Sequence, residues 1–174
     1  LIYAPSEVTA QVGNDITVKI AEKTDYPFEE KIDFNLSFPS KKDKKAFFPF
    51  HLRIPAWCNN PVITINGEAV SIAAHSGEIV RINREWKDGD EVVLNLPMEY
   101  AVRQWQVNKN SVSVDYGPLT LSLKIEEEYK QMPSTETAVW DSKWQEGADA
   151  SAWPTFEILP ASPWNYALRV QSPI

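Results

Sequence analysis

The side chains that could do covalent chemistry are few and scattered in this sequence of 174 residues. Cys58 is the only cysteine, and the nearest histidine in the sequence, His51, lies in the strand pattern that precedes it. A cysteine nucleophile needs a base and a positive environment that lower its pKa. We therefore favour an inert thiol at Cys58. A single cysteine also excludes an intrachain disulfide and a metal site built from several thiolates of this chain.

Acidic residues are the second kind of candidate, because paired carboxylates about 5 Å or about 6.5–9.5 Å apart can hydrolyse glycosidic bonds. The obvious groups are Glu126 to Glu128, and Asp88 with Asp90. Adjacent acids on a strand point to opposite faces, and Asp88-Gly89-Asp90 has the composition of a turn. A solvated surface is the favoured interpretation. A calcium site at Asp88, Asp90 and Glu91 is a weaker alternative, because the fuller ligand spacing is missing.

Tryptophans are the third kind of candidate, because flat indole rings can stack on sugar rings. Trp140, Trp144 and Trp153 lie in the segment 126–153, which follows neither the helical nor the strand period. These three are the predicted ligand-binding residues, and packing of a long loop onto the rest of the protein is the alternative that we favour. The other four tryptophans abut predicted strands and are expected to cover the core or its edge; they are Trp57, Trp86, Trp105 and Trp164.

Composition excludes several classes of function. The net charge of -7 argues against a nucleic-acid-binding protein, which needs a basic surface, and the one basic cluster, Lys41 to Lys45, is typical of a solvated hairpin tip. No apolar run approaches the ~18 residues of a membrane-spanning helix. His51 and His75 are expected on a strand face and in a loop, with no metal role. We therefore predict no catalytic residue, no metal and no cofactor in this chain.

Apolar and polar side chains alternate along most of the first 125 residues, which predicts short β-strands. The expected strands are 8–12, 16–20, 32–38, 48–54, 62–65, 68–71, 79–82, 92–96, 102–105, 112–114 and 119–123. Asn66-Gly67 predicts a type I′ hairpin turn, because both central residues of that turn need a positive φ. Residues 84–90 are expected to form a tight polar turn. About ten short strands without a helical face predict an all-β, antiparallel, jelly-roll-like β-sandwich.

The same patterns predict the domain organisation. Residues 1–125 form the sandwich, residues 126–160 an irregular tryptophan-rich excursion, and residues 161–174 a closing strand that returns to the sandwich. The closing strand is expected because Trp164, Tyr166, Leu168 and Val170 alternate with other residues. The start in mid-pattern at Leu1 favours a domain cut from a longer polypeptide.

Three segments carry a resemblance to a known family. They are Leu52-Arg53-Ile54-Pro55-Ala56-Trp57, Val62 to Glu68 with its Asn-Gly turn, and Arg84 to Asp90 followed by Leu94 to Met98. Tyr116-Gly117-Pro118-Leu119 adds a corner further on. In this order and spacing they resemble the β-sandwich region that follows the helical barrel in glycoside hydrolase family 127, the β-L-arabinofuranosidase family. The resemblance spans roughly residues 24 to 123.

The resemblance implies an accessory role. In the family, a cysteine nucleophile at a zinc ion cleaves L-arabinofuranosyl bonds within an (α/α) barrel, and Cys58 matches a position outside those catalytic motifs. We therefore expect a non-catalytic sandwich whose partner is the catalytic barrel domain of the same polypeptide. The alternative is a carbohydrate-binding module for plant-type glycans. Neither a nucleic acid nor a membrane is expected as a partner, and the resemblance slightly favours a periplasmic or extracellular location over the cytoplasm.

Overall fold

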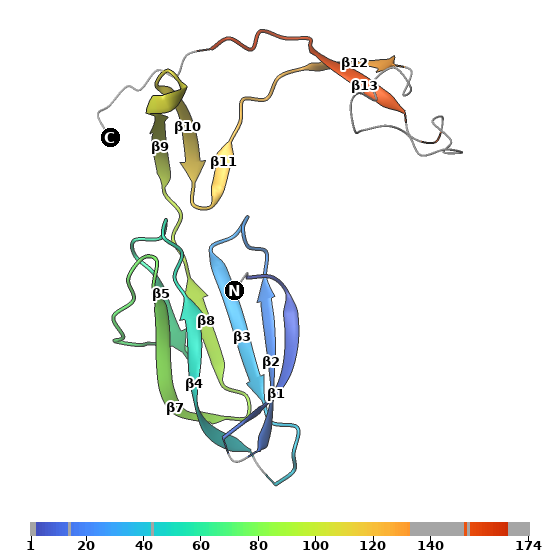
Figure 1. The fold of residues 1–174 in the computed structure, drawn as a ribbon. Helices are drawn as coiled ribbons and strands as arrows, with labels where there is room; N and C mark the ends of the chain where they lie inside the picture. The colour runs from blue at the N-terminus through green and yellow to red at the C-terminus, as the bar shows by residue number, and fades with distance from the viewer. Residues whose placement is uncertain (1–2, 14, 43, 133–151, 153, 167–174) are drawn as a thin grey trace. The chain divides into compact units, whose positions relative to one another are not determined.

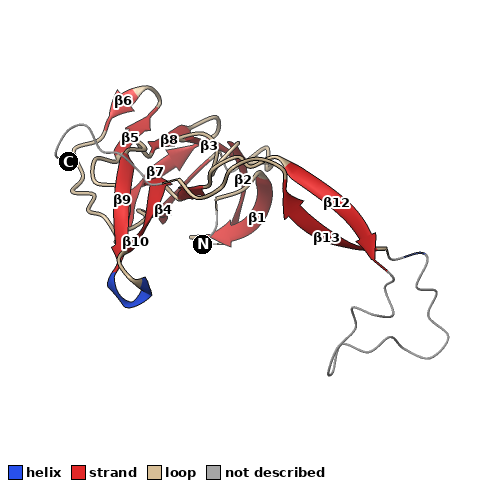
Figure 2. Cartoon of the chain, turned by 90° about the horizontal axis from the view of Figure 1, so that it is seen from above, coloured by secondary structure: helices blue, strands red, loops and turns tan. Residues whose placement is uncertain are grey.

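A computed structural model describes residues 3–13, 15–42, 44–132, 152 and 154–166. The chain divides into two compact units, Leu1–Leu121 and Ser122–Ile174, and each is described here by itself. The helices and strands assigned within the described residues are all strands, apart from the 3-10 turn η1 (Gln106–Asn108), which is blue in Figure 2. The prediction of an all-β, antiparallel fold is confirmed.

The first unit contains a β-sandwich of two antiparallel layers (Figure 1). The larger layer has six strands in the order β1-β2-β3-β8-β5-β6. Their bounds are β1 Ser6–Val12, β2 Ile16–Thr24, β3 Lys31–Ser37, β5 Val62–Ile65, β6 Glu68–Ala69 and β8 Glu91–Asn95. The smaller layer pairs β4 (Lys45–Arg53) with β7 (Ile79–Lys87). Every strand expected in the first 96 residues is present, with its ends shifted by a few residues.

The core lies between the two layers and is filled by every second residue of the facing strands. Strand β4 alternates strictly between exposed and buried positions, so that Phe48 and Phe50 point inward while His51 is exposed. Phe50 meets Phe34 of β3 with ring centroids 5.4 Å apart, which joins the two layers. Trp86 is fully buried, and its Nε1 donates to the backbone oxygen of Phe48 at 3.0 Å. The indole therefore fills the core without leaving its polar atom unpaired.

Two turns define the β5 to β8 region. Asn66 and Gly67 have φ values of 52° and 82°, so the predicted type I′ turn is confirmed. The expectation of a polar turn over residues 84–90 is wrong in its extent, because β7 continues to Lys87 and only Asp88-Gly89 forms the turn. The physical reason is the core, since the period of two that buries Ile82 also carries Trp86 inward.

The end of the first unit forms a separate sheet with the strand order β11-β10-β9. Its strands are β9 (Tyr100–Trp105), β10 (Ser111–Tyr116) and β11 (Leu119–Leu121), as expected from the sequence except that β11 is shorter. Gly117, in the β10–β11 turn, donates its backbone N–H to the oxygen of Glu99 at 3.3 Å, which ties the turn to the start of β9. We call this element the β9–β11 sheet.

In the described part of the second unit, β12 (Glu127–Met132) pairs antiparallel with β13 (Thr155–Pro160). These strands differ from the irregular excursion expected at 126–160, because cross-strand pairing orders both ends of that segment. Residues 161–166 contain no strand, and the rest of the expected closing strand lies outside the described residues. Its return to the sandwich, and the predicted division into three segments, stay predictions.

Candidate functional surfaces

The structure buries the one thiol of the chain and leaves both histidines exposed. Cys58 is fully buried, and burial raises the pKa of its thiol. His51 lies on the exposed face of β4, and His75 is exposed in the loop before β7. Cys58 therefore sits in the core as a small apolar side chain. No group of three or more His, Cys, Asp or Glu side chains that could hold a metal ion occurs among the described residues.

Asp88 and Asp90 are bound by the protein itself rather than forming a solvated acidic pair. Asp88 accepts hydrogen bonds from the backbone N–H of Phe38 at 2.8 Å and from Lys44 Nζ at 3.1 Å. Asp90 is only 6% exposed and accepts from the backbone N–H of Lys87 at 2.8 Å and from Asn66 Nδ2 at 2.9 Å. The expectation of a solvated surface is therefore wrong for Asp90. Sequence reasoning missed the burial of Asp90 because the composition of its turn does not reveal that Asn66, 24 positions away, donates a hydrogen bond to it.

The predicted ligand-binding tryptophans, Trp140, Trp144 and Trp153, lie outside the described residues. Their assignment to glycan binding therefore stays a prediction. Of the tryptophans expected to cover the core, Trp86 is fully buried and Trp57 is partly buried against the core. Trp105 and Trp164 are more exposed than expected, with 44% and 62% of their surface accessible.

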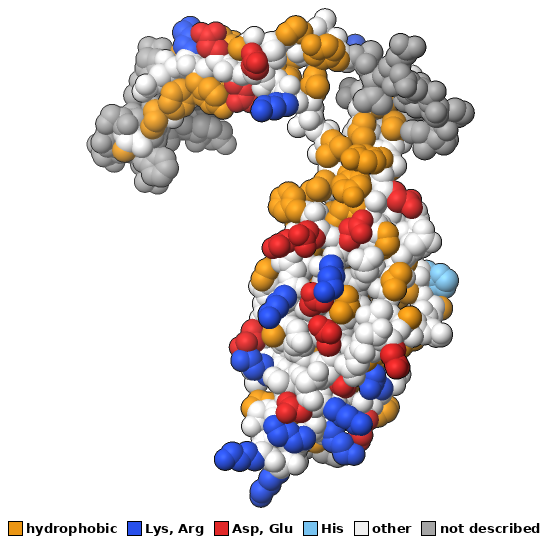
Figure 3. Space-filling view, turned by 180° about the vertical axis from the view of Figure 1, so that it is seen from behind, with side chains coloured by type: hydrophobic (Ala, Val, Ile, Leu, Met, Phe, Trp, Pro, Cys, Tyr) orange, Lys and Arg blue, Asp and Glu red, His pale blue; other side chains and the backbone are white. Residues whose placement is uncertain are grey.

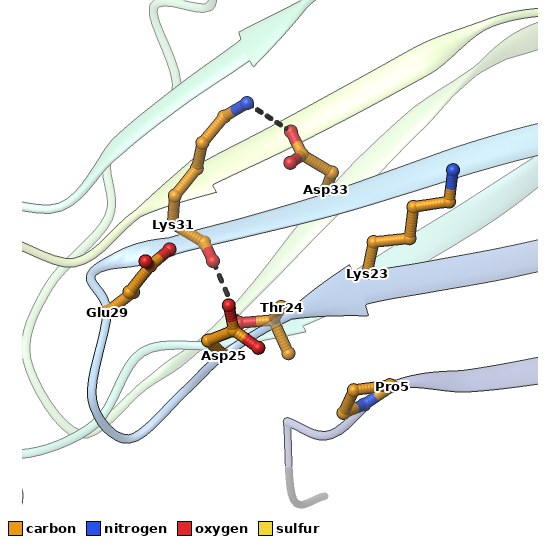
Figure 4. Close-up of a pocket in the computed structure, with 7 residues that line it drawn as sticks. All are labelled: Pro5, Lys23, Thr24, Asp25, Glu29, Lys31 and Asp33. Atoms are coloured by element: carbon orange, nitrogen blue, oxygen red, sulfur yellow. Dashed lines mark hydrogen bonds and ion pairs between the residues drawn. The ribbon is translucent and has the colours of Figure 1, made fainter.

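One pocket of the first unit is lined by charges of both signs (Figure 4). It lies where β1 begins and where β2 turns into β3. Lys31 Nζ pairs with Asp33 Oδ1 at 2.8 Å, and Thr24 Oγ1 donates to the backbone oxygen of Lys31 at 2.8 Å. The hydrogen bond and charge of Asp33 raise the pKa of Lys31. Its two lysines offset two of its three carboxylates, so the pocket carries only one net negative charge.

The β9–β11 sheet has one apolar and one polar face. The register pairs Val102 with Val114 and Val114 with Leu121, so their side chains share one face. That apolar face consists of Tyr100, Val102, Val112, Val114, Tyr116, Leu119 and Leu121. Tyr100 is 70% exposed, Val112 47% and Leu121 46%, and hydrophobic side chains gather over this sheet in Figure 3. The described residues thus leave a large part of this apolar face uncovered.

The opposite face of the same sheet is polar and internally bonded. Arg103 Nη2 pairs with Asp115 Oδ2 at 2.7 Å, and Thr120 Oγ1 donates to Asp115 Oδ1 at 2.9 Å. The guanidinium of Arg103 also lies over the ring of Trp105, 5.5 Å from its centroid. Asp115 and Asp90 are the two buried charged residues among those described. Asp115 therefore fixes the position of Arg103.

A second cleft has a volume of about 400 Å³ and is lined by residues 99–103, by Asp115 of β10 and by Gly117 of the following turn. Strand β9 is the edge strand of its sheet, and the facing wall comes from the loop between β4 and β5. We call it the β9 cleft. The residues that matter for its chemistry are Trp57, Asn59, Glu99, Arg103 and Asp115.

Comparison with known proteins identifies the family. Residues 1–98 match the family described as β-L-arabinofuranosidase, GH127 middle domain. The chain belongs to this family. The matched residues include all three segments on which the resemblance was based, the last of which ends at Met98. The recognition of family 127 from the sequence is confirmed.

Solved structures share the fold. A glycoside hydrolase is 30% identical, with a TM-score of 0.60 over 68% of this chain and 20% of its own. A GH127 β-L-arabinofuranosidase from Geobacillus stearothermophilus T6 is 24% identical, with a TM-score of 0.60 over 91% of this chain and 29% of its own. A GH127 β-arabinofuranosidase is 18% identical, with a TM-score of 0.57 over 76% of this chain and 26% of its own. The chain thus spans less than a third of each of these proteins. The comparison with curated proteins found no match.

Proposed function

We propose that this GH127 middle domain is a non-catalytic accessory β-sandwich that packs against a helical-barrel catalytic domain of the same polypeptide. The proposed parent enzyme is a glycoside hydrolase that cleaves L-arabinofuranosides. Two observations support this parent: the description of the matched family, and the length of the matched structures, of which the chain covers 20% to 29%. A catalytic domain would occupy part of the remainder.

The observation that carries the packing role is the exposed apolar face of the β9–β11 sheet. Tyr100, Val102 and Leu121 contribute to one continuous face because the strand register aligns them. Contiguous apolar surface on a soluble protein marks a contact with another domain, a partner or a ligand. Contacts between domains of one chain typically cover about 600–1,500 Å². In this proposal, the catalytic domain buries the apolar face.

The experiment tests the face in the full-length polypeptide. We expect Val102→Asp to lower the temperature at which hydrolysis of an aryl L-arabinofuranoside is lost, because a carboxylate would be buried in the contact. Ser111→Asp is the matched control, since it adds the same charge on the opposite face of the sheet. Equal behaviour of the two variants would contradict the packing role. Hydrolysis by the 174-residue chain alone would contradict the accessory role.

The alternative function, glycan binding by Trp140, Trp144 and Trp153, stays a prediction. It requires affinity for plant-type glycans that Trp144→Ala removes.

No helix in the described part of the chain has both the length and the apolar character needed to cross a membrane.

A further inference from the structure

The β9 cleft combines an aromatic ring with polar groups that the protein itself leaves unused. Trp57 Nε1 and the side chains of Asn59 and Glu99 form no hydrogen bond with any described residue, although all three line the cleft. The indole N–H is a donor, the carboxylate an acceptor, and the amide is both. Such a mixture around an aromatic side chain is typical of small-molecule sites, where a few polar groups orient a ligand.

Arg103 adds a donor that is already held in place. Its Nη2 is fixed at 2.7 Å by Asp115, whose side chain is only 10% exposed, and its guanidinium lies over Trp105. A guanidinium carries five N–H donors in a rigid fork, so most of them stay available after the ion pair forms. Because Asp115 and Trp105 already restrict this side chain, ligand binding costs little of its conformational entropy.

Strand β9 and the residue before it supply five consecutive residues to the same cleft. Residues 99–103 line it, and β10 is the one strand that pairs with β9 among the residues that the structure describes. An edge strand presents a row of backbone N–H and C=O groups. The cleft therefore offers closely spaced donors and acceptors over several residues, together with the apolar surface of Trp57.

The charges in the cleft select against anionic ligands. Glu99 and Asp115 are acidic and Arg103 is basic, so the cleft carries one net negative charge. This balance disfavours phosphates and uronic acids. A neutral molecule with many hydroxyl groups and an apolar ring face matches this arrangement. The volume of about 400 Å³ falls within the usual range of small-molecule sites.

We propose that the β9 cleft binds a neutral saccharide, with Glu99, Asn59 and Arg103 hydrogen-bonding its hydroxyl groups and Trp57 contacting its ring. This site is separate from the predicted tryptophans of the second unit. It also goes beyond the accessory role, because Glu99, Asn59, Arg103 and Trp57 are not part of the apolar face of the β9–β11 sheet. Arabinose-containing oligosaccharides are the first probes, since the proposed parent enzyme acts on arabinofuranosides.

The test is an NMR titration of the ¹⁵N-labelled 174-residue chain with L-arabinose oligosaccharides, followed through the indole N–H signals. The Trp57 signal is assigned by its loss in Trp57→Phe. We expect it to shift saturably, with a dissociation constant in the millimolar range. Glu99→Ala and Asn59→Ala should each weaken binding about tenfold, because each removes hydrogen bonds to the ligand. Both residues are exposed, so both variants should stay folded.

Glu68→Ala is the matched control, because it removes an exposed glutamate from β6, outside the cleft. It should leave the affinity unchanged. Galacturonic acid should bind more weakly than neutral sugars. Three results would overturn the proposal: no shift with any neutral saccharide, an affinity unaffected by Glu99→Ala and Asn59→Ala, or binding that Trp144→Ala abolishes while the Trp57 signal does not move. Any of these leaves the packing test of the accessory role unaffected.

Discussion

Asn66 and Asp90 join two neighbouring hairpin turns across 24 positions of the sequence, with Asn66 Nδ2 donating to Asp90 Oδ1 at 2.9 Å. Asn66 also accepts, through Oδ1, the backbone N–H of Glu91 at 2.9 Å. The second oxygen of Asp90 accepts the backbone N–H of Lys87 at 2.8 Å and thereby closes the β7–β8 turn. The Asn-Gly turn and the Asp-Gly-Asp turn are therefore hydrogen-bonded to each other. Asn66 donates to the carboxylate of Asp90, and the backbone N–H of Glu91 donates to Asn66.

The first prediction concerns this link. We expect Asp90→Ala to lower the free energy of unfolding by about 2 kcal/mol, because it leaves the N–H of Lys87 and the amide of Asn66 without their acceptor. Urea denaturation followed by circular dichroism measures the loss. Glu68→Ala, an exposed change on the adjacent hairpin, should alter stability by no more than about 0.5 kcal/mol. A cost for Asp90→Ala as small as that of the control would contradict the structural role.

The second prediction concerns the corner between β10 and β11. Gly117 has a φ of +56°, and a Cβ there would lie 2.6 Å from Cγ of Met98. We expect Gly117→Ala to destabilise the chain by about 3 kcal/mol, from left-handed backbone strain and overpacking together. A Met98→Ala background removes Cγ and Sδ and leaves only the Cβ of residue 98, 3.1 Å away, so the same substitution should cost only about 1 kcal/mol. Equal costs in both backgrounds would show that the contact with Met98 carries no penalty.

The third prediction is a pH dependence at Asp88. The backbone hydrogen bond from Phe38 and then the bond from Lys44 hold the pKa of Asp88 below its ordinary value. A lowered folded-state pKa contributes stability that is present above the unfolded pKa of about 3.9 and is lost as pH falls through the folded value. The stability difference between the chain and Asp88→Asn should therefore be largest near neutral pH and shrink below about pH 4. Denaturation series at several pH values measure it, and a difference that does not change with pH would refute the assignment.

The fourth prediction concerns the thiol of Cys58. Burial raises its pKa and blocks access, so a disulfide reagent such as Ellman's reagent should react only as the protein unfolds. The control is Asn60→Cys, which places a second thiol at an exposed position two residues away. In that variant, the thiol at position 60 should react fast with the reagent and the thiol of Cys58 should react slowly. Fast reaction of the single thiol in the unaltered folded chain would mean that Cys58 is accessible.

Local sequence patterns predicted most strands of the first unit correctly. The alternation in Phe48, Phe50 and Leu52 has the period of a strand with one buried face, and that period is visible in a few consecutive residues. The Asn66-Gly67 turn was equally predictable, because the positive φ values that it needs favour these two residue types. The segments around these elements also sufficed to recognise family 127, which the match over residues 1–98 confirms.

The extension of β7 to Lys87, the burial of Asp90 and the separate β9–β11 sheet were decided only by the tertiary structure. Each depends on groups far apart in the chain: Trp86 reaches the oxygen of Phe48, and Asp90 meets Asn66. The β9 cleft likewise needs the loop before β5 beside β9. A local pattern records which residues share a face of a strand. It does not record which distant donor, acceptor or ring lies opposite that face, and those contacts determine where a polar residue can be buried or a ligand can bind.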